Sequence, residues 1–308
     1  MHITLFFWDV LPAPKYGGTQ RMVVWLARGL AAAGHRVTLI AGQGSDVPEA
    51  TLIPVVPSDA RRADFDIRPR LPSDLDILLT YAPLRTRPDG PWLRVLPGNW
   101  KPGTKAAPNI IYLSRNHAER HGSTAFVYNG LDPKEFRFRS DKDDYDLFIG
   151  RLHAAKGYQW AVAGAKRLRR RLLLAGGWRP SFSRYVRYVG SVGGIRKADL
   201  IAGARALWMP ALWDEPFGIT LIEALVSGTP VLGTRRGSLP EIVSPEVGTL
   251  GDTLEELIER RPSLDVIAPE ACRSRVQRHF THHVMAEGYL RMFRHYLAEG
   301  TLPEGRLL

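Results

Sequence analysis

The stretch that most constrains this chain runs from Trp213 to Glu241 and reads WDEPFGITLIEALVSGTPVLGTRRGSLPE. A Pro-Phe-Gly turn leads into an apolar run, whose spacing predicts a helix starting at Ile219. Gly218 lets the backbone of this turn approach a ligand closely. A Ser-Gly pair ends the helix, and a strand is predicted over 231–234. The stretch is therefore a turn, helix and strand of an α/β protein.

The beginning of this helix is suited to binding an anion. The first amides, on Ile219, Thr220 and Leu221, have no carbonyl partner one turn earlier and lie at the positive end of the helix dipole. Phosphate is the anion best matched to such a site. Glu215 and Glu223 lie on either side of the turn, and a carboxylate at 223 can accept hydrogen bonds from paired sugar hydroxyls. For either glutamate alone, a solvated surface position is an equally good interpretation.

Composition limits the class of protein. The 308 residues are enough for two domains, and 44% hydrophobic with 24% charged residues indicate a soluble globular chain. The net charge of +11 is compatible with nucleic acid, an anionic membrane surface or an acidic substrate as a partner. The single cysteine, Cys272, excludes an intrachain disulfide and fits a reducing compartment. Without an apolar run of about 20 residues or a signal peptide pattern, we expect a cytoplasmic protein, or one peripheral to a membrane.

The N-terminal part has the pattern of a parallel βαβ unit. A strand is predicted over 2–8, a helix from Thr19 to about Ala33, and a second strand over 36–41. The loop before the helix contains Gly17 and Gly18. A glycine pair is weak support for phosphate binding, because many such pairs are simple turns and the spacing is not that of the dinucleotide fingerprint.

The loop after the strand predicted at 145–150 contains two cationic residues. The strand over 145–150 is followed by RLHAAKG, in which Arg151 and Lys156 occupy the loop before a helix. Residues at the carboxyl end of a parallel strand face the ligand crevice, and these two cations suit a diphosphate. The alternative is a pair of ordinary surface cations. Units of a strand followed by a turn are predicted at 172–177 and 186–194, a strand at 206–211, and helices at 253–260, 269–279 and 283–298.

The region between these units is less clear. Strands are predicted at 51–56, 76–80, 92–96, 109–113 and 125–128. The basic segment from Arg61 to Arg70 is interpreted as a solvated loop, with an acceptor or membrane surface as the alternative. Ser114 is predicted to cap a helix carrying His117 and His121, which have no third ligand in pattern for a metal. The run KRLRRR at 166–171 is interpreted as an exposed helix end, with nucleic-acid contact as the lesser alternative.

These segments resemble the retaining glycosyltransferases of family 4, which have the GT-B fold. The resemblance covers nearly the whole chain, strongly over 145–250, moderately over 1–45 and weakly over 46–125. It is carried by the E-x7-E pattern from Glu215 to Glu223, the small-x-Gly-x-Pro-Val run after it, and the Gly-Arg and Lys-Gly pairs of 150–157. The segments GGTQRMVVWLARGLAAAGHRVTLI and VYNGLDPKEF add to it.

The resemblance implies an α/β protein of the GT-B type, with two Rossmann-like, doubly wound parallel-sheet domains facing a central cleft. Residues 1–138 would be the acceptor-side domain and 139–282 the donor-binding domain. The C-terminal helix, about 283–308, would pack back onto the first domain. The linker at 137–144 contains the acidic cluster DKDD, which we interpret as a solvated hinge rather than a metal site.

The resemblance also implies roles for individual residues. Arg151, Lys156 and Glu215 would be the catalytic residues. Sugar contacts would come from Glu215, Phe217 and Gly218, the ribose contact from Glu223 and the base contact from Val192. The donor diphosphate would be bound by Gly17, Gly18, Arg151, Lys156 and the backbone of Ile219, Thr220 and Leu221.

The implied reaction moves a hexose, with retention, from a nucleotide-diphosphate sugar to a hydroxyl of a glycan, lipid-linked or small-molecule acceptor. UDP is favoured as the nucleotide, and neither a metal nor a cofactor is expected. An inactive GT-B scaffold, or an epimerase or phosphorylase on the same fold, remains an alternative. A basic nucleic-acid binder is the least favoured, because the sequence lacks a recognition motif of that kind.

One departure from the family concerns the acceptor side. Many members have a histidine after a strand in the middle of the first domain, where it contacts the transferred sugar. The corresponding segment here, LRVLPGNW at 93–100, has none. Asn99 or Trp100 is the candidate for that place, which leaves the identity of the sugar open.

Overall fold

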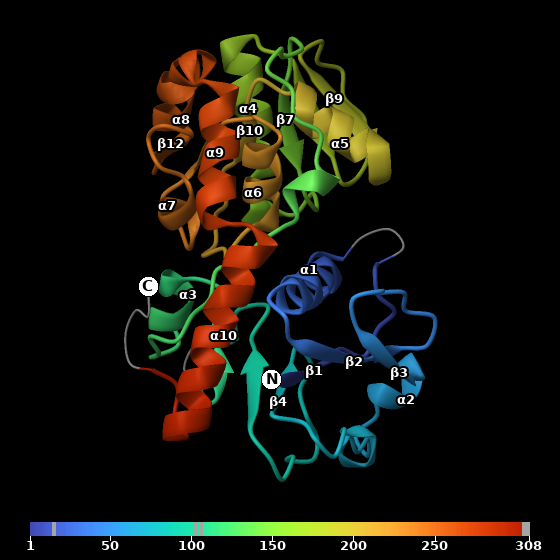
Figure 1. Ribbon diagram of the computed structural model, residues 1–308. Helices are drawn as coiled ribbons and strands as arrows, with labels where there is room; N and C mark the ends of the chain where they lie inside the picture. The colour runs from blue at the N-terminus through green and yellow to red at the C-terminus, as the bar shows by residue number, and fades with distance from the viewer. Residues whose placement is uncertain (14–16, 101–103, 105–106, 304–308) are drawn as a thin grey trace. The chain divides into compact units, whose positions relative to one another are not determined.

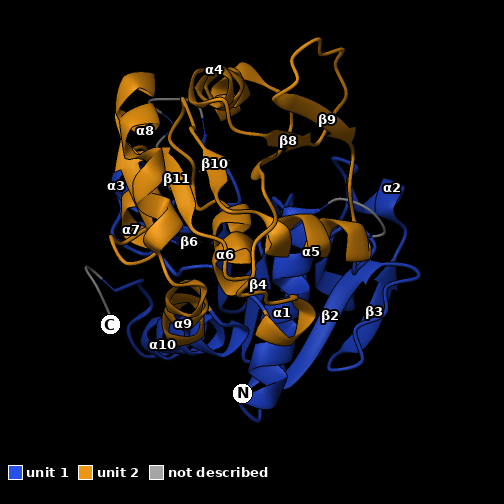
Figure 2. Ribbon diagram, turned by 90° about the horizontal axis from the view of Figure 1, so that it is seen from above, with its two compact units in different colours: residues 1–131, 281–308 blue, residues 132–280 orange. Residues whose placement is uncertain are grey.

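The computed structural model describes residues 1–13, 17–100, 104 and 107–303 (Figure 1). The chain forms two compact units, one of residues 1–131 and 281–308, and one of residues 132–280 (Figure 2). The domain boundaries expected from the sequence were 138/139 and 282/283. Each unit has its own sheet and is described by itself.

Unit 1 is built on a six-stranded parallel sheet with the strand order β3-β2-β1-β4-β5-β6. Its strands are β1 (His2–Phe6), β2 (Arg36–Gly42), β3 (Thr51–Val55), β4 (Ile77–Thr80), β5 (Trp92–Val95) and β6 (Ile110–Ile111). Its helices are α1 (Gly18–Ala32), α2 (Pro57–Ala60), α3 (Arg115–Glu119) and α10 (His282–Glu299), with a 3-10 turn at Arg68–Arg70.

The predicted βαβ unit at the start of the chain is present as β1, α1 and β2. The apolar face of α1 is buried, because Met22, Val23, Leu26 and Leu30 recur at helical spacing. α10 packs against α1 and buries Met285, Tyr289 and Phe293. The expected helix over 283–308 ends at Glu299, and residues 304–308 lie outside the described part of the chain.

One predicted strand is wrong. Residues 125–128 do not form a strand; Phe126 makes only an isolated parallel bridge with Tyr112. β6 itself is limited to Ile110 and Ile111. The apolar residues of this region are buried instead in a satellite cluster formed by Leu96, Ile110, Tyr112 and Ala118. A buried segment can have the apolar sequence pattern of a strand even where its backbone does not form the hydrogen bonds of a sheet.

Unit 2 repeats the topology of unit 1, with the order β12-β11-β10-β7-β8-β9 and all pairs parallel. Read from β9, this is the 3-2-1-4-5-6 order of a doubly wound sheet, as in unit 1. The strands are β7 (Asp146–Ile149), β8 (Leu172–Ala175), β9 (Val186–Gly190), β10 (Leu207–Met209), β11 (Val231–Thr234) and β12 (Gly248–Gly251).

The helices of unit 2 follow its strands along the chain (Figure 1). They are α4 (Tyr158–Leu168), α5 (Gly194–Gly203), α6 (Ile219–Val226), α7 (Leu239–Ile242), α8 (Leu254–Arg260) and α9 (Pro269–His279), with 3-10 turns at Pro133–Glu135, Ala154–Lys156 and Arg261–Val266. The fold class inferred from the sequence, two doubly wound parallel sheets, is confirmed.

The core of unit 2 contains a buried polar network. Asp146, at the start of β7, accepts hydrogen bonds from Nε of Arg261 at 2.7 Å and from Nε1 of Trp208 at 2.9 Å. Arg261 is fully buried, and its charge is balanced by Asp146 and Asp265. A buried charge is tolerated only when it is paired in this way. The network joins the turn after α8 to the two central strands.

Candidate active site

The candidate site in unit 2 lies where the strand order reverses. β7 and β10 are neighbours in the sheet, and the chain leaves them in opposite directions, toward β8 and toward β11. Ligands of doubly wound sheets bind outside the carboxyl ends of the strands at such a switch point. The segment after β7 contains Arg151 and Lys156, and the segment after β10 contains Glu215. The topology therefore brings these two parts of the sequence to one edge of one sheet.

The loop after β7 is held against the end of β10 by backbone contacts. The amide of Leu212 donates a hydrogen bond to the carbonyl of Ala155 at 2.8 Å. Gly157 has a φ of 69° and lies so close to β10 that a Cβ atom would come within 1.7 Å of the Pro210 oxygen. Only glycine fits this position. These contacts place Lys156, the residue immediately before Gly157, beside the loop that carries Glu215.

Lys156 and Glu215 form an ion pair with an aromatic third member. Nζ of Lys156 lies 2.5 Å from Oε2 of Glu215, and the same oxygen accepts a hydrogen bond from Nε1 of Trp213 at 3.0 Å. The ammonium also lies 4.7 Å from the centre of the Trp213 ring. The Lys156 and Glu215 side chains are 19% and 11% exposed, so both reach the surface while most of each is covered.

The backbone around Glu215 is fixed from the segment before α7. The amide of Ser238 donates to the Glu215 carbonyl at 3.0 Å, and Oγ of Ser238 donates to the Phe217 carbonyl at 2.7 Å. The Phe217 side chain is buried and packs edge-to-face against Phe280. A contact of Phe217 with a ligand would therefore come from its backbone.

The helix after this turn begins as predicted. Gly218 is the N-cap of α6 with a φ of 80°, a conformation that glycine adopts readily. The amide of Leu221 donates to the Gly218 carbonyl at 2.9 Å, which engages one of the three amides named as an anion site. The amides of Ile219 and Thr220 remain the candidates for a phosphate contact at this helix start.

Glu223 has a partner that the sequence did not reveal. It lies inside α6, is 1% exposed, and its two carboxylate oxygens are 2.9 Å and 2.6 Å from Nζ of Lys197 on α5. The lysine side chain is 20% exposed. A buried carboxylate is stabilised by such a cation, and the pair crosses between two helices that follow different strands. Lys197 therefore joins the candidate site residues.

The remaining predicted residues of unit 2 lie on loops at the same edge. Arg151 directly follows the Gly150 at the end of β7 and is exposed. His153 is also exposed, and its Nδ1 accepts a hydrogen bond from the Ala155 amide at 3.2 Å. Val192 lies half-buried in the loop between β9 and α5. The amide of Lys156 donates a hydrogen bond to the His153 carbonyl at 3.0 Å, so His153 belongs to the turn that carries this lysine.

The predicted residues of unit 1 also follow carboxyl ends of strands. Gly17 is the N-cap of α1 and Gly18 its first residue, in the connection between β1 and β2. Asn99 and Trp100 follow β5. Their predicted roles toward a diphosphate and an acceptor stay predictions.

Trp100 belongs to an aromatic cluster with both histidines considered for a metal. Its ring lies 6.1 Å from that of His121, which stacks on Tyr112 at 5.3 Å, and His117 contacts Tyr112 edge-on at 5.1 Å. Ser114 caps α3 as predicted, by accepting a hydrogen bond from the His117 amide. Burial lowers the pKa of His117 to about 4. In the described part of the chain, no group of three or more His, Cys, Asp or Glu could hold a metal ion.

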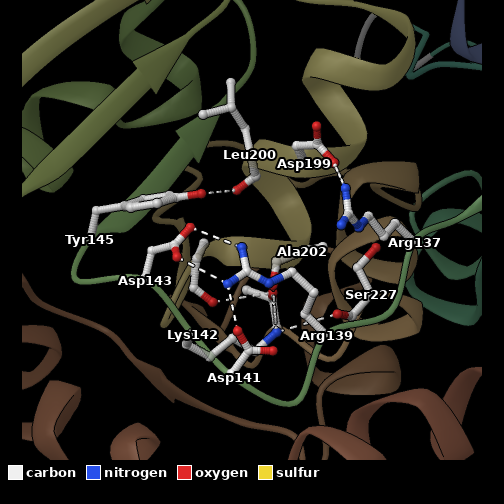
Figure 3. A network of polar contacts seen from close by, with 12 residues as sticks. Arg137, Arg139, Asp141, Lys142, Asp143, Tyr145, Asp199, Leu200, Ala202 and Ser227 are labelled. Carbon is white, nitrogen blue, oxygen red and sulfur yellow. Dashed lines mark hydrogen bonds and ion pairs between the residues drawn. The ribbon is translucent and has the colours of Figure 1, made fainter.

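Two of the three aspartates in the acidic cluster DKDD pair with an arginine of the same segment, and Asp144 lies 3.6 Å from Arg205. The Arg139 guanidinium donates to Asp141 at 2.8 Å and to Asp143 at 3.0 Å (Figure 3). Lys142 turns inward and donates to the carbonyls of Ala202 at 2.8 Å and Ser227 at 3.3 Å. Burial lowers the pKa of this lysine to about 8. The cluster thus ties the segment to the ends of α5 and α6.

An open cavity of about 690 Å³ lies next to this network, between the segment 137–145 and α5. Its arginines already have partners: Arg137 pairs with Asp199 at 2.6 Å, and Arg196 donates to the Val189 carbonyl at 3.1 Å. The cavity contains neither Lys156 nor Glu215. We therefore place the candidate site at the strand ends and not in this cavity.

Comparison with known proteins gives consistent results. Residues 145–260 match the family model described as Glycosyl transferases group 1. Over 151 residues the chain is 29% identical to an uncharacterised glycosyltransferase of Methanocaldococcus jannaschii, an alignment that covers 39% of this chain. The chain spans only 38% of the length of that relative.

Solved structures match over almost the whole chain. AviGT4, a glycosyltransferase involved in avilamycin A biosynthesis, is 28% identical, with a TM-score of 0.79 and coverage of 98% of this chain and 99% of that one. HepE of Anabaena, solved in complex with UDP-glucose, is 14% identical with a TM-score of 0.66, and 96% of this chain and 99% of that one are covered. The second likeness shows a shared fold.

Proposed function

We propose that the chain is a group 1 glycosyltransferase that transfers a hexose from a nucleotide-diphosphate sugar to an acceptor hydroxyl. Residues 145–260 match the model of that family, and the chain has the GT-B fold. The observation that carries the proposal is the Lys156–Glu215 pair at the switch point of unit 2. A cation and a carboxylate held side by side there can serve the two parts of one donor, its phosphates and its sugar.

We assign the diphosphate to the cations and amides around this pair. Lys156 has three donors, so it can contact a phosphate oxygen while it remains beside Glu215. Arg151 offers a planar fork suited to phosphate oxygens, and the first amides of α6 add the positive end of the helix dipole. These groups would neutralise the charge that develops on the departing diphosphate, so the proposal requires no metal.

Glu215 would contact the transferred sugar and Glu223 the ribose. A carboxylate accepts hydrogen bonds from neighbouring hydroxyls, and Lys197 balances the charge of Glu223 where that residue is buried. Because Glu223 is only 1% exposed, the ribose would reach one edge of its carboxylate.

The proposed reaction retains the configuration of the sugar. The acceptor oxygen would attack the face from which the diphosphate departs, and a phosphate oxygen would take the acceptor proton. The bond from the anomeric carbon to the phosphate oxygen breaks, and a bond to the acceptor oxygen forms. No side chain of this chain is assigned as a general base, and the role of the protein is to orient the donor and stabilise the leaving group.

We favour UDP as the nucleotide of the donor. The structure of HepE with UDP-glucose supports a nucleotide sugar as the ligand of this fold. The acceptor stays open among glycans, lipid-linked molecules and small molecules.

Thermal unfolding with a panel of UDP, GDP, ADP and their sugars, without added metal, tests the donor class. A ligand present at a hundredfold excess over its Kd stabilises the folded state by about 2.7 kcal/mol, enough to shift the melting temperature visibly. Stabilisation by one nucleotide and its sugars would support the proposal. If no nucleotide or nucleotide sugar stabilises the protein, the donor assignment is wrong and an inactive scaffold becomes the better interpretation.

A further inference from the structure

The positive charge of this chain is concentrated in one segment. Residues 147–198 contain twelve Lys and Arg and no Asp or Glu. The other 30 of the protein's 42 basic residues, and all 31 of its acidic residues, lie elsewhere in the chain. The net charge of +11 therefore comes entirely from the part of unit 2 that runs from β7 to α5. The rest of the chain is nearly neutral, with 30 basic and 31 acidic residues.

Several of these cations gather around β8 and β9. The amide of Leu172 donates to the carbonyl of Tyr185 at 2.7 Å, so the residues before them, Arg171 and Arg184, are neighbours at the amino ends of the two strands. Arg187 follows on β9, an edge strand of the sheet. All three arginines are exposed, and none forms an ion pair with a carboxylate among the residues that the structure describes.

The loop between β8 and β9 carries two exposed aromatic residues. Phe182 is fully exposed and Trp178 is 72% exposed. Figure 2 shows the connection between β8 and β9 extending outward from the sheet of unit 2. Both side chains leave apolar area in contact with water, which a second surface could cover.

We propose that the region of β8, β9 and their connecting loop docks on an anionic lipid bilayer through the exposed side chains of Arg171, Arg184, Arg187, Trp178 and Phe182. Clustered arginines are attracted to anionic headgroups, and Trp and Phe side chains enter the boundary between headgroups and acyl chains. A single-stranded nucleic acid would need a groove or platform on which several bases stack, and here the two exposed aromatic residues lie on one loop instead. The lipid surface is therefore the partner that these observations favour.

The other basic segment of the chain does not offer the same surface. In 61–70, Arg61 pairs with Asp9 at 2.6 Å, and Arg62 and Arg68 pair with acidic residues of the same segment. The alternative of a membrane surface at this segment is thus weaker than at β8 and β9. The proposal does not depend on glycosyl transfer, and it requires no membrane-spanning element; no helix in the described part of the chain is long and apolar enough to cross a bilayer.

Flotation with vesicles tests the proposal on the full chain. The protein is mixed with vesicles of phosphatidylcholine alone, or of phosphatidylcholine with phosphatidylglycerol, at low and high salt. We expect binding only to the anionic vesicles, and weaker binding at high salt. In the double variant Arg171→Glu, Arg184→Glu, binding should fall at least tenfold, because each cation near such a surface contributes about fivefold.

Two further variants separate charge from insertion. Phe182→Ser should weaken binding at high salt more than at low salt, because salt screens only the electrostatic part. In Arg85→Glu, Arg87→Glu, which makes the same charge change on exposed residues of unit 1, binding should stay within about twofold of the wild type. Intrinsic fluorescence should shift to the blue on anionic vesicles in the wild type and less in Trp178→Phe.

Three results would overturn the proposal. The first is the absence of vesicle binding, with or without tight binding of single-stranded RNA. The second is an equal loss of binding in Arg85→Glu, Arg87→Glu, which would show that binding depends on the net charge of the protein and not on this surface. The third is a fluorescence shift that Trp178→Phe leaves unchanged. Circular dichroism is used to check that each variant is folded, so that a loss of binding can be attributed to the surface.

Discussion

Lys156 and Glu215 are 59 residues apart in the sequence, yet Nζ of one lies 2.5 Å from Oε2 of the other. They are brought together because β7 and β10 are neighbours at the switch point of the sheet. The Gly157 contact and the Ala155–Leu212 hydrogen bond then fix the loop that carries the lysine. The proposed function depends on this pair.

Lys156→Ala should lower the rate of transfer by about 10²- to 10³-fold, the usual effect of removing one group that stabilises the leaving group. The protein should remain folded, and its melting temperature is compared with that of the wild type to confirm this. Lys166→Ala, which removes an exposed lysine of α4, is the matched control. Turnover near that of the wild type in Lys156→Ala would remove this residue from the diphosphate site.

Lys197 and Glu223 should act as one unit in nucleotide binding. We expect Glu223→Gln and Lys197→Met each to weaken binding of the stabilising nucleoside diphosphate by about tenfold, with the double variant no weaker than the worse single variant. The wild type should prefer the ribonucleotide to its 2′-deoxy form, and both variants should lose that preference. A preference that survives in Glu223→Gln would show that the carboxylate does not bind the ribose.

Gly157→Ala should destabilise unit 2 by more than about 2 kcal/mol, because its Cβ would overlap a backbone oxygen that has no room to move. The matched control is Gly190→Ala, a position with a φ of 77° and nothing within 4 Å of the added Cβ. It should cost about 1–2 kcal/mol, from backbone conformation alone. Urea denaturation measures both values, and equal losses would mean that the close approach to Pro210 is not a constraint.

His117 should make unit 1 sensitive to acid. Its pKa is lowered to about 4, chiefly by burial and also by the nearby His121 and Arg120, whereas the unfolded chain has the ordinary value of 6.5. The unfolded state then binds more protons between these values. Stability should therefore fall as the pH decreases from 6.5 to 4, by up to about 3 kcal/mol.

Chemical denaturation at several pH values checks this prediction. In His117→Gln, most of the fall in stability between pH 6.5 and 4 should be lost. The control is His283→Gln, a substitution at an exposed histidine, which should keep the pH dependence of the wild type. An unchanged slope in His117→Gln would show that another group causes the acid sensitivity.

Local sequence patterns were sufficient for most of the fold. The helical spacing of Met22, Val23, Leu26 and Leu30 predicted α1, and the turn at Gly218 predicted the start of α6. The loop positions of Arg151 and Lys156 followed from the rule for strand carboxyl ends. Each of these inferences rests on residues close together in the sequence.

The contacts that the sequence did not reveal join distant segments. Glu223 and Lys197 are 26 residues apart on different helices, and no spacing rule connects them. The pair of Asp146 and Arg261 joins residues 115 apart. The aromatic cluster of Trp100 and His121 likewise depends on how α3 packs. The apolar sequence of 125–128 also does not indicate whether its backbone forms hydrogen bonds with a neighbouring strand.

Isothermal titration of nucleoside diphosphates into the wild type and Lys156→Ala, without added metal, tests the central claim most directly. We predict that one nucleoside diphosphate binds the wild type, that the corresponding nucleoside without phosphates binds at least about 10²-fold more weakly, and that Lys156→Ala loses most of this difference. Absence of binding by every nucleoside diphosphate, or equal binding by wild type and variant, would contradict a diphosphate site at Lys156 and Glu215.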